Sequence, residues 1–221
     1  MRIMASMLRG GERLSVAMAG AFLVCASSAC AATIDVGPIA GSLYLDSHLL
    51  DYRWDTSPRS LWGVSGTTKL GPFGTGVRVW RATTSQDSGI PGESIVPAVK
   101  MTVTEAIGEY RVVQLRSMRV VSSASIGRLH LGYTPDQVTF GGGGAGGDIE
   151  VDFRPIDEWI MGAGLTLRHR LFGGFDAGVG VDRSWFRLDT AHRAGDDIVN
   201  ERETFGNWTA RIELTHQIFR L

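Results

Sequence analysis

Few of the side chains that could perform chemistry stand at spacings that would let them work together. The five histidines lack the His-x-x-x-His spacing that binds a metal on one helical face; they are His48, His130, His169, His192 and His216. Ser65 follows Gly63 without the Gly-x-Ser-x-Gly spacing of a hydrolase nucleophile. We therefore predict no metal site, no cofactor and no catalytic residue.

One group has the residue types of a hydrolytic triad. Ser42, Asp46 and His48 alternate along one face of a predicted strand. Residues i and i+2 of a strand are about 7 Å apart, which is too far for direct hydrogen bonds between short side chains. We interpret Asp46 and His48 as packing residues inside a barrel.

The N-terminus has the pattern of a cleaved secretory signal. Basic residues precede the apolar run Leu14–Val24, which is too short to span a membrane as a helix. The sequence Ala29-Cys30-Ala31 predicts cleavage after Ala31, so that 1–31 is a signal peptide and 32–221 the exported domain. Cys25 and Cys30 both fall in the leader, which leaves the exported domain without disulfides or thiolate ligands. A lipoprotein signal at Cys30 is the less favoured alternative, because no large aliphatic residue stands three positions before it.

The charge balance excludes one class of partner. The formal net charge is −1, with 22 basic and 23 acidic residues. A protein that binds nucleic acid is expected to carry a basic excess. The sequence therefore predicts no nucleic-acid partner.

A period of two dominates the stretch from Trp159 to Trp185 and predicts an antiparallel strand pair. A two-residue turn would set outward Leu171 against inward Asp176. A three-residue turn, Phe172-Gly173-Gly174, instead places Leu171 opposite Phe175 and Arg170 opposite Asp176. We predict this register and an ion pair between Arg170 and Asp176 in the lumen.

The two faces of these strands differ in chemistry. Aliphatic and small residues on one face are bracketed by aromatic residues at strand ends: Trp159, Phe175, Trp185, Trp208 and Phe219. The other face carries three charges of each sign: Arg168, Arg170, Arg211, Asp176, Asp182 and Glu213. Aromatic girdles and a lumen of paired charges favour a transmembrane β-barrel. A soluble periplasmic ligand-binding barrel is the alternative, with the apolar face inside.

The remaining strands are assigned from alternation and turn residues. We expect strands over Ile39–Trp54, Leu61–Leu70, Gly76–Ala82, Gly127–Tyr133 and Ile149–Phe153, and a pair Ile95–Ala106 and Glu109–Val121 turning at Ile107-Gly108. Residues 83–94 and 190–204 are expected to be polar loops. The glycine-rich stretch 141–147 is read as a bent or flexible segment. The raw count is nine or ten strands; length favours an all-β, antiparallel up-and-down barrel of eight, with ten as the alternative.

The signal sequence, the Trp159–Trp185 hairpin and the amphipathic last strand resemble small Gram-negative outer-membrane β-barrels, the class of the OmpA transmembrane domain, OmpX and OmpW. The resemblance implies an outer-membrane location, contact with membrane lipid, lipopolysaccharide and the insertion machinery, and a monomer. One departure is that Phe219 and Leu221 fall off the lipid-facing phase, whereas such barrels end in an outward aromatic residue. A bulge near Ile218 would restore the phase.

The functional expectation follows from a barrel this narrow. Eight strands leave only enough room for their own side chains, so we expect a structural or surface-interaction role without a large pore, carried by residues 83–94 and 190–204. The alternatives are a narrow channel for small hydrophobic molecules and an enzyme that modifies lipid A.

Overall fold

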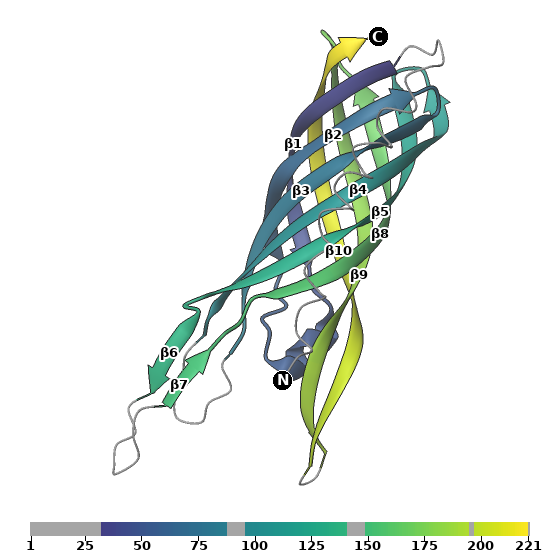
Figure 1. Cartoon of the computed structure of the whole chain (residues 1–221). Helices are drawn as coiled ribbons and strands as arrows, with labels where there is room; N and C mark the ends of the chain where they lie inside the picture. The colour runs from purple at the N-terminus through teal and green to yellow at the C-terminus, as the bar shows by residue number, and fades with distance from the viewer. Residues whose placement is uncertain (1–31, 88–95, 141–148, 195–196, 221) are drawn as a thin grey trace, which may run out of the picture. The chain divides into compact units, whose positions relative to one another are not determined.

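The computed structural model describes residues 32–87, 96–140, 149–194 and 197–220. Eight antiparallel strands close into a barrel in the order β1-β10-β9-β8-β5-β4-β3-β2 (Figure 1). Their bounds are β1 Ala32–Tyr44, β2 Arg59–Leu70, β3 Phe73–Ser85, β4 Ala98–Leu115, β5 Met118–Thr134, β8 Ile156–Arg170, β9 Phe175–Ala194 and β10 Asp197–Arg220. The prediction of an eight-stranded up-and-down barrel is confirmed.

Two further strands explain why the raw count approached ten. β6 (Gln137–Phe140) pairs with β7 (Ile149–Asp152) in a separate hairpin between β5 and β8. This hairpin lies outside the closed ring. The predicted signal peptide, with both cysteines and its cleavage site, and the glycine-rich stretch 141–147 lie outside the described residues.

Short turns and long connections gather at opposite ends of the barrel. The end with the two-residue turns and with β10's C-terminus is called the turn end, and the opposite end, from which the β6–β7 hairpin projects, is called the loop end (Figure 1). The predicted turn at Phe172-Gly173-Gly174 is confirmed. Gly173 and Gly174 have φ of 61° and 83°, and Leu171 N donates to Phe175 O at 2.8 Å. Arg170 lies opposite Asp176, as predicted.

The turn predicted at Ile107-Gly108 is wrong. β4 runs without interruption through these residues, and the chain turns at Arg116-Ser117, where Leu115 pairs with Met118. The buried phase passes through Ile107 and Glu109 unchanged, and Gly108 faces outward with nothing near its absent side chain. The prediction failed because Gly108 is an outward-facing glycine within a strand and not a turn residue.

Three other boundaries differ from the expectation. β1 ends at Tyr44, ten residues before the predicted Trp54, and a 3-10 helix, η2 (Ser47–Tyr52), follows. The expected loop 83–94 begins as strand, because β3 continues to Ser85; residues 88–95 lie outside the described part. The expected loop 190–204 is mostly an extension of β9 and β10, because polar residues continue the ladder after the apolar alternation has ended.

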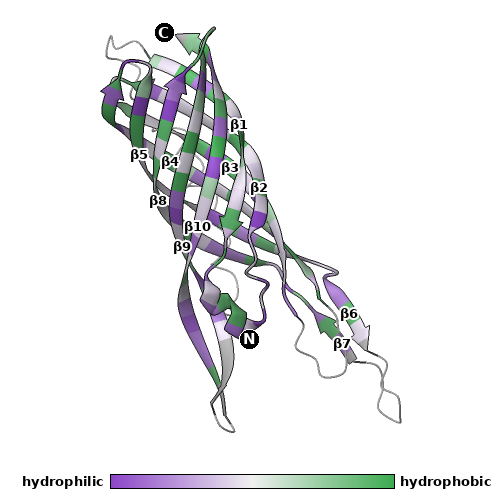
Figure 2. Ribbon diagram, turned by 180° about the vertical axis from the view of Figure 1, so that it is seen from behind, coloured by the Kyte–Doolittle hydropathy of each residue, from purple (hydrophilic) through white to green (hydrophobic). Residues whose placement is uncertain are grey.

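Polar and apolar residues alternate along the strands (Figure 2), and the exposed apolar side chains form the predicted band on the outer face. Its side chains, exposed by 44–62%, include Met161, Leu165, Leu167, Val179, Val181, Ile212 and Leu214. Exposed aromatic residues border this band near the loop end (Tyr44, Trp62, Trp159, Trp185, Trp208) and near the turn end (Phe73, Tyr110, Phe172, Phe219). Two aromatic girdles around an aliphatic band are the surface of a transmembrane barrel. Among the described residues, no helix is long and apolar enough to cross a membrane.

The last strand contains a bulge at the place where one would restore the outward phase of the terminal aromatic residue. Asp35 pairs with Gln217 and Ile34 with Phe219, so Ile218 is the extra residue of β10. Facing residues of an antiparallel pair share a side, and Ile34 stands in the outward phase of β1. The bulge therefore returns Phe219, which is 62% exposed, to the outer face.

Candidate functional site

The half of the lumen toward the turn end is filled with charge. Five cations and six carboxylates of the described strands project into it: Lys69, Arg78, Arg119, Arg168, Arg211, Asp35, Glu105, Glu109, Asp176, Asp182 and Glu213. Five of the six charges predicted to face inward belong to this set. Removing an ion from water costs several kcal/mol unless it is paired, so the pairing of these groups decides whether the lumen is stable.

Arg168 is the centre of one cluster. Its two terminal nitrogens each donate to a different oxygen of Glu109 at 2.6 Å, and its Nε donates to Glu213. A bidentate ion pair between an arginine and a carboxylate is among the strongest side-chain interactions. The three residues come from β8, β4 and β10, which are not neighbours in the sheet, so this cluster joins three walls of the barrel.

A second cluster surrounds Asp182. Arg78 donates to Glu105 at 2.7 Å and lies 3.4 Å from Asp182, while Arg211 Nε lies 2.9 Å from the same carboxylate. The indole of Trp80 also donates to Glu105 at 3.0 Å. This bond joins the charged half of the lumen to the apolar half beyond it.

The predicted ion pair between Arg170 and Asp176 is wrong, although their register is right. Arg170 is exposed at the strand end, whereas Asp176 is bonded by Arg119 and lies 3.6 Å from Lys69. Lys69 also donates to Asp35. Arg119 comes from β5, two strands away from β9, and so was not visible in the register of the β8–β9 pair.

Glycines make room for this packing. A side chain on Gly180 would meet Arg211 Nη1 at 2.2 Å, and one on Gly127 would meet the backbone oxygen of Thr104 at 2.1 Å. The first clash is with a lumen cation and the second with the neighbouring strand itself. Inward glycine thus permits both the long cations and the strong coiling of a narrow barrel.

The half of the lumen toward the loop end is apolar. Its described members are Ile39, Leu43, Leu61, Trp80, Ala82, Val99, Met101, Val103, Leu129, Leu131, Ile160, Phe186, Leu188 and Phe205. Leu43, Val99, Val103, Leu129 and Leu131 have no exposed surface at all. Side chains packed to this degree leave no open path through the described part of the lumen.

The connection between β1 and β2 covers the loop-end mouth. Leu49 of η2 is buried with the apolar residues, and the ring of Tyr52 meets Phe205 edge-on with centroids 6.0 Å apart. Tyr52 also hydrogen-bonds through its hydroxyl to Glu203 on β10. The segment therefore acts as a lid held by both apolar and polar contacts.

Asp46 begins this lid. Its carboxylate accepts the N–H groups of His48 (3.1 Å) and of Gly206 on β10 (2.7 Å). Burial alone would raise the pKa of Asp46, but the hydrogen bonds from Gly206 and His48 lower the pKa below its ordinary value. An ionised carboxylate thus ties η2 to the barrel wall.

The prediction that Asp46 and His48 pack inside the lumen is wrong, because β1 ends before them. The His48 side chain is 79% exposed, and its Nδ1 lies 3.3 Å from the Asp46 carboxylate. No serine side chain hydrogen-bonds to either residue within the described residues. The pair is a helix cap rather than part of a triad.

A hollow of about 300 Å³ lies beside the lid. Leu49, Trp54 and Leu188 give it an apolar floor, and Gln86, Asp87 and Asp189 a polar rim. Its volume is at the lower end of the range for small-molecule pockets. This hollow could not be predicted from the sequence, because its residues come from connections and strand ends that are far apart along the chain.

Beyond the barrel, β9 and β10 continue as a two-stranded ribbon. β8 pairs with β9 only as far as Phe186, and β1 pairs with β10 only as far as Trp208, whereas β9 and β10 stay paired to Ala194 and Asp197. Arg202 near the base of the ribbon donates to Glu158 on β8 at 2.7 Å. The ribbon is therefore anchored to the barrel at its base.

The remaining histidines whose side chains the structure describes do not converge, and the side chain of His192 lies outside that part. His130 lies beside Asp157 at 2.9 Å, the ring of His216 packs on Phe175, and His169 is exposed near the turn end. In the part of the chain that the structure describes, no three His, Cys, Asp or Glu side chains are grouped so as to hold a metal ion.

Comparison with known proteins identifies the class of fold. No protein-family model matches the sequence, and no curated protein is similar to it in sequence. Neisserial surface protein A is 7% identical, with a TM-score of 0.54 over 85% of this chain and 97% of that one. OprG of Pseudomonas aeruginosa is 10% identical, with a TM-score of 0.45 over 86% and 96%.

Neisserial surface protein A is a small outer-membrane β-barrel, and this likeness in fold confirms the resemblance drawn from the sequence. The fold is the eight-stranded antiparallel barrel of that class. At 7% identity the likeness shows the fold alone.

Proposed function

We propose that this protein is an exported outer-membrane barrel with a filled lumen that acts through its extracellular surface. The observation that carries the proposal is the packing of the lumen, with paired charges in one half and unexposed aliphatic side chains in the other. A barrel of this kind is a rigid support rather than a pore. The surface it supports is the β9–β10 ribbon and the β6–β7 hairpin.

Orientation follows from the general plan of such barrels. Their termini and short turns face the periplasm, and their longer connections face outward. The loop end, with the lid, the ribbon and the hairpin, is then the extracellular end. In this arrangement the protein is a monomer that contacts membrane lipid and lipopolysaccharide and depends on the insertion machinery.

Epitope accessibility tests this orientation. A tag inserted between Ala194 and Asp197 should bind antibody on intact Gram-negative cells. The matched control carries the same tag at the Arg116-Ser117 turn and should bind only after permeabilisation. Recovery of the protein in osmotic-shock fluid without detergent, or labelling of the control tag on intact cells, would contradict the proposal.

Single-channel recording tests the filled lumen. The folded protein in a planar bilayer should give no steady conductance on the scale of a general porin recorded in parallel. Stable porin-scale currents would refute a filled lumen, whatever the orientation.

A narrow passage for small hydrophobic molecules is the second candidate. It is favoured by the hollow beside the lid, because Leu49, Trp54 and Leu188 in its floor belong to the same buried apolar cluster as the side chains in the apolar half of the lumen. A molecule that entered there would still meet the ion-pair clusters near the turn end. Uptake of a hydrophobic tracer into proteoliposomes, compared with protein-free liposomes, separates this candidate from the first.

A further inference from the structure

The outer face near the loop end has a feature that neither the lumen nor the ribbon explains. Each of the four outward tryptophans in the girdle has an arginine over its ring: Arg81 on Trp62, Arg128 on Trp159, and Arg183 on both Trp185 and Trp208, at 4.3–6.0 Å from the ring centroids. Such stacking holds a guanidinium close to an apolar surface. Cations are thus held at the level where the apolar band ends.

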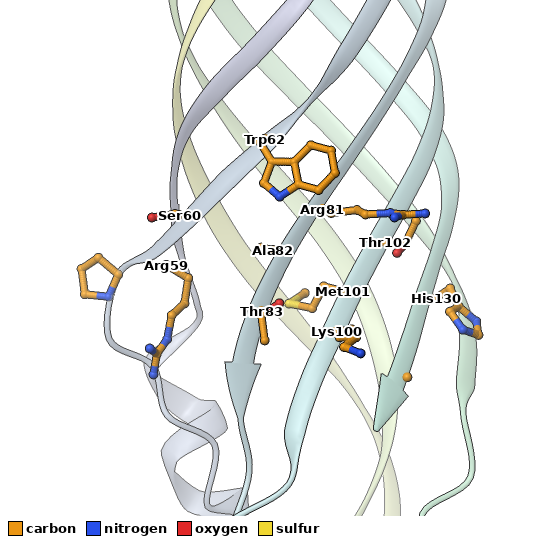
Figure 3. A pocket seen from close by; sticks show the side chains of 12 residues that line it. Arg59, Ser60, Trp62, Arg81, Ala82, Thr83, Lys100, Met101, Thr102 and His130 are labelled. Atoms are coloured by element: carbon orange, nitrogen blue, oxygen red, sulfur yellow. The ribbon is translucent and has the colours of Figure 1, made fainter. Parts of the chain in front are cut away.

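A hollow with a volume of about 810 Å³ lies on this face over β2, β3, β4 and β5 (Figure 3). Trp62, Arg81, Thr102 and His130 lie side by side in one row of the ladder, each opposite the next. Lys100 occupies the next outward position of β4, opposite Gly132. Gly132 has no side chain, and a Cβ atom there would lie 3.7 Å from His130 Nε2, so the His130 ring reaches over this position beside Lys100.

The spacing suits a group with several anionic oxygens. Neighbouring strands are about 4.8 Å apart, so the backbones of Arg81, Lys100 and His130 fall within about 10 Å of one another. Thr83 and Thr102 lie on the same strands as Arg81 and Lys100, and Ser60 lines the hollow from β2. Long basic side chains with hydroxyls between them can donate to a phosphate from several sides.

The charge of the groove is not balanced by the protein. Arg59 is paired with Asp55, and His130 lies beside Asp157. Arg81 and Lys100 are exposed and have no carboxylate partner among the described residues. An anion that fills the groove would therefore supply the missing charges.

From this juxtaposition we infer that the groove of Arg81, Lys100 and His130 binds the phosphorylated headgroup of a membrane lipid, of the class found in lipopolysaccharide. The apolar band directly beside the groove would receive the acyl chains, and the cations would receive the phosphates. A soluble phosphate compound would satisfy only the cations. The inference rests on the membrane location proposed above, but its test does not require cells.

Binding in micelles tests the headgroup. The protein, folded in neutral detergent, is titrated with diphosphorylated lipid A and with dephosphorylated lipid A, and bound lipid is counted by native mass spectrometry. We expect the phosphorylated lipid to bind about tenfold more tightly or better. The double variant Arg81→Gln/Lys100→Gln should lose about tenfold in affinity. The control Arg111→Gln/Arg116→Gln, at exposed turn-end positions, should change it less than about twofold.

Two results would overturn the inference: equal binding of both forms of lipid A, or unchanged binding by the Arg81/Lys100 variant. A titration with inorganic pyrophosphate distinguishes the source of the phosphate. Pyrophosphate that bound as tightly as lipid A would identify a site for soluble phosphate instead of a lipid site. Failure of the cell-based location test would leave the result in micelles unaffected.

Amine labelling gives a second readout, because the chain has only two lysines. Lys100 is exposed on the outer face, whereas Lys69 is mostly buried and bonded to Asp35. Phosphorylated lipid A should protect Lys100 from acetylation and leave the low reactivity of Lys69 unchanged. Protection of Lys100 by dephosphorylated lipid A to the same degree would contradict phosphate recognition.

Discussion

Arg168 on β8 and Glu109 on β4 meet across the lumen through two hydrogen bonds of 2.6 Å, although β5 separates their strands in the sheet. Both side chains are buried. A barrel wall is held together by hydrogen bonds between neighbouring strands, whereas this contact joins strands that are not neighbours. It therefore resists both flattening of the barrel and entry of water from the turn end.

Removal of one residue of this ion pair should leave the charge of the other buried without a partner. We expect Arg168→Met to lower the free energy of unfolding by about 3–5 kcal/mol, because two buried carboxylates lose their shared cation. Adding Glu109→Gln should recover part of the loss, with a coupling energy of about 1–3 kcal/mol. Urea titration in detergent, followed by heat-modifiable gel mobility, measures the cycle; additive single and double variants would contradict the contact.

Substitutions at Arg119 and Arg170 test which of these two arginines is the partner of Asp176. Arg119→Ala should destabilise the barrel by about 1–3 kcal/mol, since it removes a partly buried charged hydrogen bond. Arg170→Ala is the matched control and should stay within about 0.5 kcal/mol, because its side chain is exposed. A larger effect at Arg170 than at Arg119 in the same titration would restore the pair predicted from the sequence.

Glycines that face the lumen and glycines that face outward should differ in how well they tolerate substitution by alanine. Gly127→Ala places a methyl group against the backbone of β4 and should cost about 1–3 kcal/mol through overpacking. Gly108→Ala, on the same pair of strands but facing open space, should cost no more than about 0.5 kcal/mol. Equal losses of stability in the two variants would show that glycine is needed at both positions for backbone flexibility, and not for the space that a missing side chain leaves.

The bulge at Ile218 leads to a prediction about assembly. Phe219→Ser should reduce the amount of folded protein in the outer membrane, because it removes the outward aromatic residue near the end of β10. Deletion of Ile218 should be tolerated, because regular alternation then sets Phe219 opposite Ile34 without a bulge. The folded fraction is read from heat-modifiable mobility of isolated membranes. A deletion variant as deficient as Phe219→Ser would mean that the bulge itself is needed.

Asp46 should make the lid sensitive to acid. Its pKa is lowered in the folded protein, so its contribution is complete above the ordinary carboxyl pKa of about 4 and is lost as the pH falls through the lower folded value. The protection factor of the Gly206 N–H, which compares its exchange rate with that of an unprotected amide at the same pH, should therefore fall at acid pH in the wild type. Asp46→Ala should show little protection of this N–H at any pH. Wild-type protection that persisted unchanged in strong acid would contradict the role of the carboxylate.

The features that the sequence predicted are those that depend on neighbouring residues or neighbouring strands. The turn at Phe172-Gly173-Gly174, the outward aliphatic band and the bulge near Ile218 all follow from alternation and its interruptions. The strand and turn boundaries were predicted wrongly where the alternation of polar and apolar residues no longer reports which face of a strand is buried. Gly108 has no side chain to carry the pattern, and the charged residues after Leu188 continue a ladder that no longer borders an apolar band.

The ion-pair partners inside the lumen could not be predicted from the sequence for a different reason. Arg119 with Asp176 and Arg168 with Glu109 each join strands that are separated by at least one other strand. Such pairs depend on barrel circumference and strand stagger, which a single sequence does not reveal. The lid and the basic groove likewise combine residues from several connections and strands.

The β9–β10 ribbon has a consequence for molecular recognition. From Arg187 to Ala194 it extends about 23 Å at 3.3 Å per residue, and its two strands are hydrogen-bonded to each other along this whole length. A flexible loop of the same reach would lose conformational freedom each time it met a partner, and that loss would weaken every encounter. Here the backbone is already ordered by pairing, so binding of a partner to the ribbon carries less of this entropy cost.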